Sequence, residues 1–193
     1  MALASPALDN GIGANWCTSS TPFGAGDLGT PGAANDCPVV VPDIVINEIM
    51  PDPSAVSDAN GEWLELYNAG AGAVDLDGWT IEDNGSDSHT INNGGPLLIA
   101  AGGYLVLGRN GDAGTNGGVS VDYQYSSFIL GNTDDEVVLF DALANEVDRV
   151  EYDGGPAFPD PNGASMALIS PALDNGIGAN WCTATTPYGD GDA

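Results

Sequence analysis

Hydrophobic and polar residues alternate in short stretches along the chain, and this pattern predicts an all-β protein. Clusters of Gly, Asn, Asp and Pro separate the stretches at intervals of about ten residues, a spacing typical of a β-sandwich or barrel. We predict strands at residues 43–50, 62–68, 78–83, 89–91, 104–108, 121–128, 136–141, 146–152 and 165–169. No stretch has a convincing helical period.

Alternation within these strands indicates which side chains enter the core. In residues 62–67, Leu64 and Leu66 fall on the same face of the strand as Glu62, whereas Trp63 falls on the other. The hydrophobic positions expected to form the core are Leu64, Leu66, Trp79, Ile81, Leu105, Leu107, Val138 and Phe140.

The first 28 residues of the chain occur again at its end. Residues 1–28 align with residues 166–193 at a constant offset of 165 residues, with 22 of 28 positions identical. This favours a segment of a tandem array, in which Met1 is an internal residue equivalent to Met166; the alternative is a duplication inside one self-contained protein. The hydrophobic residues expected to mediate assembly are Met1, Leu3 and Trp16 in the first copy and Met166, Leu168 and Trp181 in the second.

The composition of the chain changes near residue 42. Residues 24–36 contain almost no strand former and are rich in Gly and Ala. We therefore assign residues 1–36 to the C-terminal tail of a preceding repeat and residues 37–42 to a linker. Residues 43–193 are assigned to one β-sandwich domain whose own tail is truncated.

The charge of the chain is strongly negative. It has 28 acidic residues and only two basic ones, Arg109 and Arg149, for a net charge of −26. Nucleic acid is not an expected partner, because binding to a phosphate backbone depends on Lys and Arg. Mutual repulsion should make stability depend on salt or divalent cations, although the acids can also serve only solubility. No hydrophobic run is long enough to span a membrane.

Three cysteines and the absence of lysine favour an extracellular or cell-surface location. Cys17 and Cys182 occupy the same position in the two copies, and Cys37 occurs once. A disulfide between Cys17 and Cys37 is the preferred pairing, because the two are close in sequence; Cys182 then pairs with a residue beyond this sequence. A Cys37–Cys182 bridge is the alternative.

Several motifs, in their order along the chain, resemble a known family. They are Gly29-Thr-Pro-Gly-Ala-Ala-Asn35, Val45-Ile-Asn-Glu-Ile-Met50, Gly61-Glu-Trp-Leu-Glu-Leu-Tyr-Asn68, Val74-Asp-Leu-Asp-Gly-Trp-Thr-Ile-Glu-Asp83, Gly102-Gly-Tyr-Leu-Val-Leu107, Glu136-Val-Val-Leu-Phe-Asp141 and Val147-Asp-Arg-Val-Glu-Tyr152. They resemble the lamin tail domain in its bacterial, extracellular tandem-repeat form, over residues 43–193. The resemblance implies an immunoglobulin-like β-sandwich of about nine strands.

The same resemblance bears on function. Bacterial members of the family are often attached to surface proteins and extracellular nucleases, and animal members are the globular tails of nuclear filament proteins. This chain lacks the basic surface associated with DNA and chromatin binding in the animal tails, so that role is not expected here.

Neither an active site nor a phosphate loop is indicated. The single histidine, His89, has no nucleophile of recognisable context near it in sequence, and the Gly-rich strings lack the Lys-Ser/Thr of a phosphate loop. We expect the protein not to be an enzyme. His89 is interpreted as a histidine at a strand edge, bonded to a neighbour.

Calcium is the one ligand that the sequence suggests. Asp52, Asp58, Asn60 and Glu62 lie in a loop rich in the oxygen ligands that calcium prefers, and residues 83–87 form a second, weaker cluster. Neither fits the EF-hand pattern. Turn formation explains the same residues without a metal.

Two classes of function follow. The first is a structural repeat unit of an extracellular fibre or surface adhesin, assembled head-to-tail with copies of itself or with neighbouring repeats. The alternative is a cell-surface module that binds a carbohydrate or protein partner. An exposed aromatic cluster, for which Trp63, Tyr123 and Tyr125 are candidates, would favour the alternative.

Overall fold

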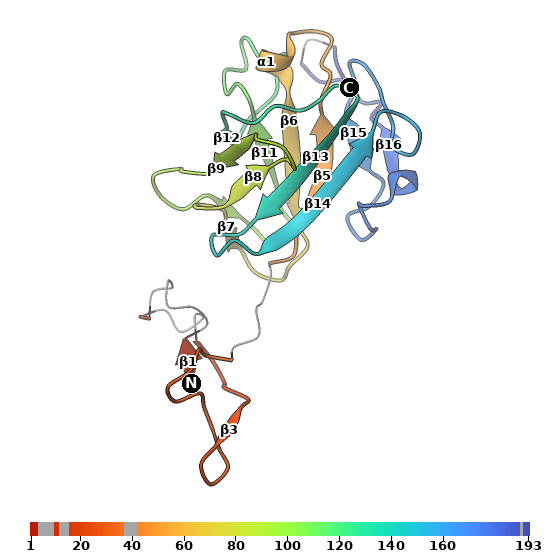
Figure 1. Cartoon of the computed structure of the whole chain (residues 1–193). Coiled ribbons are helices and arrows are strands. Elements are labelled where there is room, and N and C mark those ends of the chain that lie inside the picture. Colours follow the sequence, from red (N-terminus) through yellow and green to blue (C-terminus); the bar gives the residue numbers. More distant parts are fainter. Residues whose placement is uncertain (4–9, 12–15, 37–41, 190) are drawn as a thin grey trace. The chain divides into compact units, whose positions relative to one another are not determined.

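The computed structural model describes residues 1–3, 10–11, 16–36, 42–189 and 191–193 (Figure 1). The chain divides into two compact units, Met1–Val41 and Pro42–Ala193. The boundary falls inside the segment 37–42 that the sequence analysis assigns to a linker. The assignment of residues 1–36 to a preceding repeat stays a prediction.

The larger unit is built almost entirely of strands. They are β5 (Ile44–Met50), β6 (Trp63–Asn68), β7 (Val74–Asp75), β8 (Thr80–Glu82), β9 (Ser88–Thr90), β10 (Leu98–Ile99), β11 (Tyr104–Gly108), β12 (Tyr123–Gln124), β13 (Asp134–Phe140), β14 (Glu146–Asp153), β15 (Met166–Leu168) and β16 (Trp181–Thr183). One helical turn, α1 (Asp58–Gly61), precedes β6, and a 3-10 turn, η2 (Gly178–Asn180), precedes β16.

These strands form two main layers. One sheet has the order β12-β11-β6-β5-β15-β16, and the other has the order β14-β13-β8-β9. In Figure 1 the sheet with β13 and β14 lies in front of the sheet with β5 and β6. Large buried side chains from both sheets meet in one hydrophobic core. The predicted all-β sandwich is confirmed.

Most of the predicted strands occur in the structure, and the differences have local causes. The strand predicted at residues 121–128 is reduced to β12, and Ser127, with a φ of +58°, has a backbone that β structure does not allow. The short strands β7 and β10 pair only with each other and were not predicted. Each has two residues, too few for alternation to be visible.

The core contains nearly all of the predicted side chains, with one error of phase in β13. Val137 and Leu139 belong to the core cluster, whereas Val138 is buried outside it and Phe140 is only half-buried. Four consecutive hydrophobic residues leave the inward phase of this strand ambiguous, because both alternations fit. The β-bulge at Leu139/Phe140 then ends the regular alternation.

The smaller unit contains four short strands among its described residues. β1 (Ala2–Leu3) pairs with β2 (Trp16–Cys17), and β3 (Pro22–Phe23) pairs with β4 (Asp27–Leu28). The side chain of Asp36 accepts hydrogen bonds from the N–H groups of Ser20 and Thr21 at 2.8 and 2.6 Å. These bonds hold the pKa of Asp36 well below its usual value, with the largest contribution from the hydroxyl of Ser19.

Candidate functional site

The segment 166–193 is built into the edge of the six-stranded sheet. β15 pairs with β5, so that Met166 lies opposite Ile49, and β16 pairs with β15, so that Trp181 lies opposite Leu168. Met166, Leu168 and Trp181 are all buried and belong to the hydrophobic core. The terminal copy of the repeat is therefore a structural part of the sandwich.

A buried polar network fixes the loop between β15 and β16. The amide Nδ2 of Asn175 donates to the carbonyl of Ile46 at 3.1 Å and to the carboxylate of Asp148 at 2.7 Å. The indole N–H of Trp181 donates to the carbonyl of Asn175 at 2.8 Å. Burial raises the pKa of Asp148, and its bonds from Ile46 N–H and Asn175 oppose that rise. The bonds replace the lost hydration of these groups.

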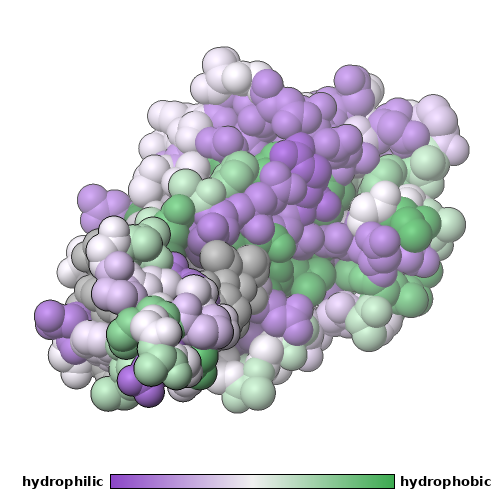
Figure 2. Space-filling view, turned by 60° about the horizontal axis from the view of Figure 1, so that its bottom comes forward, coloured by the Kyte–Doolittle hydropathy of each residue, from purple (hydrophilic) through white to green (hydrophobic). Residues whose placement is uncertain are grey.

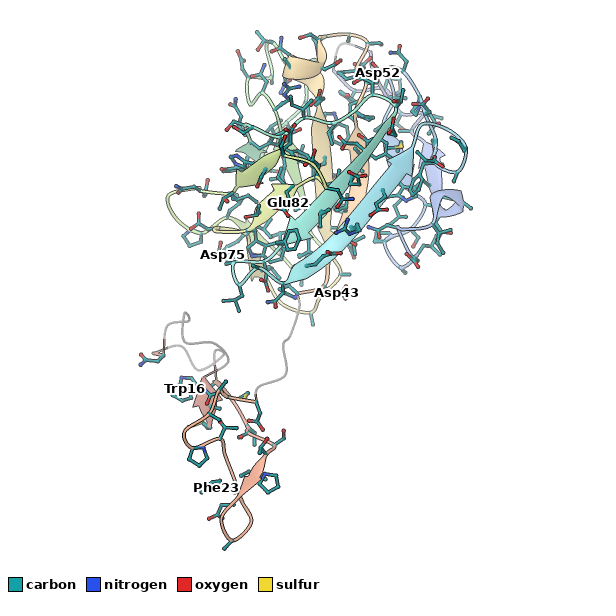
Figure 3. All side chains as sticks on the ribbon, viewed as in Figure 1. Trp16, Phe23, Asp43, Asp52, Asp75 and Glu82 are labelled. Atoms are coloured by element: carbon teal, nitrogen blue, oxygen red, sulfur yellow. The ribbon has the colours of Figure 1, made fainter. Side chains whose placement is uncertain are left out.

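The last residues of the segment reach the end of the sandwich where β5 finishes. The carboxylate of Asp192 is only 3% exposed, and it accepts hydrogen bonds from Ser54 Oγ at 2.7 Å and from the N–H of Ala55 at 3.1 Å. The hydroxyl of Tyr188 accepts a bond from the indole N–H of Trp63 at 3.1 Å, and the two rings meet edge to face. Figure 3 labels the adjacent Asp52 at this end.

Two glycines of the segment lie where a side chain would not fit. A Cβ on Gly178 would come within 2.5 Å of the backbone of Ala157, and one on Gly189 would come within 1.8 Å of the carbonyl of Gly117. Both contacts are with backbone atoms, which cannot move aside as a flexible side chain can. Glycine at these two positions is therefore a requirement of docking.

The described residues of the first copy share local structure with their equivalents in the second. β1 and β2 pair with Leu3 opposite Trp16, the register of β15 and β16, and the indole of Trp16 donates to the carbonyl of Asn10 at 2.9 Å. In the turn after β3, Gly26 N–H donates to the carbonyl of Phe23 at 3.0 Å, as Gly191 N–H does to that of Tyr188. The described residues of the two copies therefore pair in the same register.

The two copies differ in what covers them. Met1 is 97% exposed and Trp16 is 38% exposed, whereas Met166 and Trp181 are 1% and 5% exposed. Phe23 and Leu28 are also exposed, and with Met1 and Pro31 they line a depression on the smaller unit. Figure 3 labels Trp16 and Phe23 on this unit. Met1 and Trp16 of the first copy are thus exposed, whereas Met166 and Trp181 of the second copy are buried.

A family model described as Lamin Tail Domain matches residues 40–154. The chain belongs to the lamin tail domain family. The immunoglobulin-like sandwich expected from the sequence is thereby confirmed. The match ends before β15 and β16, so the family assignment does not by itself account for the docked terminal segment. Comparison with curated proteins gives no match.

The predicted calcium ligands of this lamin tail domain are only partly brought together. The amide of Asn132 bridges Asp52 and Asp58, at 3.2 and 3.3 Å, and Asn60 accepts a bond from Asn110 at 3.4 Å. Glu62 instead points into the sandwich. In the part of the chain that the structure describes, no three His, Cys, Asp or Glu side chains are grouped so as to hold a metal. Calcium binding here stays a hypothesis.

The second acidic cluster, at residues 83–87, forms a turn. One carboxylate oxygen of Asp83 accepts hydrogen bonds from the N–H of Gly85 at 2.8 Å and from that of Asp87 at 3.0 Å. The guanidinium of Arg149 donates to the side chain of Asn84 at 2.9 Å. Turn formation therefore accounts for this cluster, as the alternative interpretation of the sequence states.

Glu62 forms a buried ion pair with Arg109. Its Oε1 lies 2.8 Å from Arg109 Nη1, and its Oε2 accepts a bond from the N–H of Leu130 at 3.1 Å. Burial raises the pKa of Glu62 to about 7, although both partners favour the charged form. The ion pair joins the start of β6 to the end of β11, and the bond from Leu130 ties Glu62 to the loop that precedes β13.

The structure describes Cys17 and Cys182, and the predicted disulfide involves Cys17 and Cys37. Cys182 is a free thiol and is exposed. Cys37, the predicted partner of Cys17, lies outside the described residues, as does most of the linker 37–42. The Cys17–Cys37 pairing, and a partner for Cys182 beyond this sequence, stay predictions.

The aromatic residues proposed for a binding surface do not form an exposed cluster. Tyr125 is buried in the core, Trp63 is covered by Tyr188, and Tyr123 is half-buried. The hydroxyl of Tyr123 instead contacts His89 Nε2 at 2.9 Å, and His89 Nδ1 accepts a bond from Ser126 N–H at 3.3 Å. Burial lowers the pKa of His89. His89 is thus bonded to neighbours at the sheet edge formed by β9.

Hydrophilic and hydrophobic residues are both present on the face shown in Figure 2. In Figure 2 purple residues cover much of the visible face, with smaller green areas between them. Among the described residues, no helix is long and hydrophobic enough to cross a membrane.

Several residues of the docked segment were not identified from the sequence. Asn175, Gly178 and Asp192 fix the segment by polar bonds and close approach, and the sequence analysis named only hydrophobic positions. The repeat itself contains the missing signal, because each of these polar or small residues is identical in the first copy.

Proposed function

We propose that this lamin tail domain is a structural repeat unit of an extracellular fibre, assembled head-to-tail through its repeated segment. One observation carries the proposal. Nearly the same sequence completes the edge of the sandwich at residues 166–193 and is present at residues 1–28, where Met1, Trp16, Phe23 and Leu28 are exposed. A contact between different surfaces of successive units does not close on itself, and repetition gives an open fibre.

The remaining features suit such a role. The proposal assigns this unit a structural role and no catalytic one, in keeping with its immunoglobulin-like fold. The chain has 28 acidic and only two basic residues, so neighbouring fibres repel one another. The same repulsion makes the joint between units depend on cations, and calcium at Asp52 and Asp58 is the candidate. A disulfide between Cys17 and Cys37 would limit the swing between successive sandwiches and requires an oxidising compartment.

Electron microscopy of the native protein tests this function. We expect filaments with regularly spaced globular domains, and removal of divalent cations with a chelator should loosen their spacing. Isolated globular particles at all protein and salt concentrations would refute the fibre. A cell-surface binding module on a short stalk would then be the better interpretation.

A further inference from the structure

The six buried residues of the docked segment are all retained in the first copy. Among the described residues of 166–193, the buried ones are Met166, Leu168, Asn175, Gly178, Trp181 and Asp192. Their counterparts at positions 1, 3, 10, 13, 16 and 27 are identical, so none of the six substitutions between the copies falls on a buried position of the described segment. The first copy therefore keeps every residue that is buried in the described part of the docked segment.

Residues of the first copy are exposed at positions where the equivalent residues of the second copy contact the sandwich. A Cβ on Gly189 would collide with Gly117, whereas one on the equivalent Gly24 would meet nothing within 4 Å. Asp192 is buried against Ser54, whereas the equivalent Asp27 is exposed. Equivalent residues of the two copies thus have different surroundings.

We propose that residues 1–28 bind a second copy of this chain by adding a strand along β5, in the register that residues 166–193 use here. This inference rests on the proposed head-to-tail assembly and specifies its joint. β1 takes the place of β15, which sets Met1 opposite Ile49 of the second copy. Asn10 then replaces Asn175 beside Asp148, and Asp27 replaces Asp192 at the N–H groups of Ser54 and Ala55.

The two segments compete for one edge, and residues 166–193 have the advantage of belonging to the same chain and of one additional hydrogen bond. Phe23 stands where the second copy has Tyr188, so it can contact the ring of Trp63 but cannot accept its indole N–H. One net hydrogen bond of ordinary strength changes a binding constant about fivefold. Residues 166–193 of the same chain therefore hold β5 by default, and residues 1–28 of another copy bind when that segment is weakened.

Sedimentation of variants of the full chain tests the exchange. Trp181→Ala weakens the docked segment, and this chain should form dimers and larger species at lower concentrations than the unchanged chain does. The double variant Trp16→Ala/Trp181→Ala is the matched control and should lose this association. Association that persists in the double variant, or a Trp181→Ala chain that stays monomeric, would overturn the proposal.

A milder variant covers the case in which Trp181→Ala does not fold. Tyr188→Phe makes the docked segment equal to residues 1–28 at the contact with Trp63, and we expect association to strengthen about fivefold relative to the unchanged chain. Association equal to that of the unchanged chain would count against exchange at this edge.

Cross-link mapping then identifies the joint. A photoreactive benzoyl-phenylalanine at position 23, in the Trp181→Ala chain, should attach to peptides around Trp63 of another copy. Attachment to the sheet of β13 and β14 would refute the β5 register. If the native protein forms filaments but the cross-links map elsewhere, the proposed exchange at β5 is refuted and the fibre is not. If the cross-links map to Trp63 but the native protein forms no filaments, the fibre is refuted and the exchange is not.

Discussion

The two tryptophans of the repeat provide the sharpest test that residues 166–193 belong to the sandwich. Trp181 and Trp16 have the same neighbours in sequence and the same hydrogen bond to the carbonyl six residues earlier. They differ in exposure, 5% against 38%, and only Trp181 lies in the core of the larger unit. Replacing each by alanine removes the same chemical group from two different environments.

The expected effects differ several-fold. Removing a buried tryptophan costs about 3–5 kcal/mol, because both the transfer energy and the packing around Phe158 are lost. For a unit of this size such a loss lowers the melting temperature by about 10 °C. Trp16→Ala changes the other compact unit and should leave the unfolding free energy of the sandwich within about 0.5 kcal/mol of its original value.

Urea unfolding of both variants measures the difference. The fluorescence of Trp63 and Trp79 reports on the sandwich alone, since both are buried there and remain in both variants. Dilute protein keeps residues 1–28 of other copies from replacing the weakened segment. If Trp16→Ala lowers the stability of the sandwich as much as Trp181→Ala does, or if Trp181→Ala costs less than about 1 kcal/mol, the segment is not an integral part of this fold.

Three further outcomes are expected. Calcium should raise the melting temperature more than sodium chloride of equal ionic strength, and Asp58→Asn should reduce that excess; equal effects of the two salts would leave only screening. Peptide mapping of the intact protein should recover Cys17 linked to Cys37, a bridge worth about 3 kcal/mol, and a Cys37–Cys182 peptide would disprove the pairing. Because the folded pKa of Glu62 is about 7 and its unfolded value is 4.5, the folded state binds this proton more tightly. Its contribution to stability is full below pH 4.5 and is lost as the pH rises toward 7, so Glu62→Gln should flatten the pH profile of unfolding free energy over that interval; an unchanged slope would refute this.

The sequence predicted the sandwich well because strand alternation and turn residues are local signals. β11 occupies the residues expected for it, and Leu64 and Leu66 face the core as the alternation of β6 requires. The partner of Glu62 could not be found this way. Arg109 is 47 residues away from Glu62 in the sequence. A local pattern cannot show that the carboxylate of Glu62, before β6, meets the guanidinium of Arg109, after β11. Glu62 was accordingly assigned to a calcium loop, whereas the structure places it in an ion pair.

The two copies of the repeat act as a substitution experiment on the docked segment. Ala4 and Ile169 differ, and Ile169 is exposed; Ser20 and Thr185 differ, and Thr185 is exposed. Gly178 and Asn175 are identical in the first copy. At Gly178 a Cβ would collide with the backbone of Ala157, and the side chain of Asn175 donates two hydrogen bonds, to Ile46 and Asp148. Exposed positions tolerate change because solvent accommodates any side chain, whereas buried positions must satisfy one shape and one set of bonds. The pattern of identity between residues 1–28 and 166–193 is therefore the pattern expected if both copies dock on the same surface.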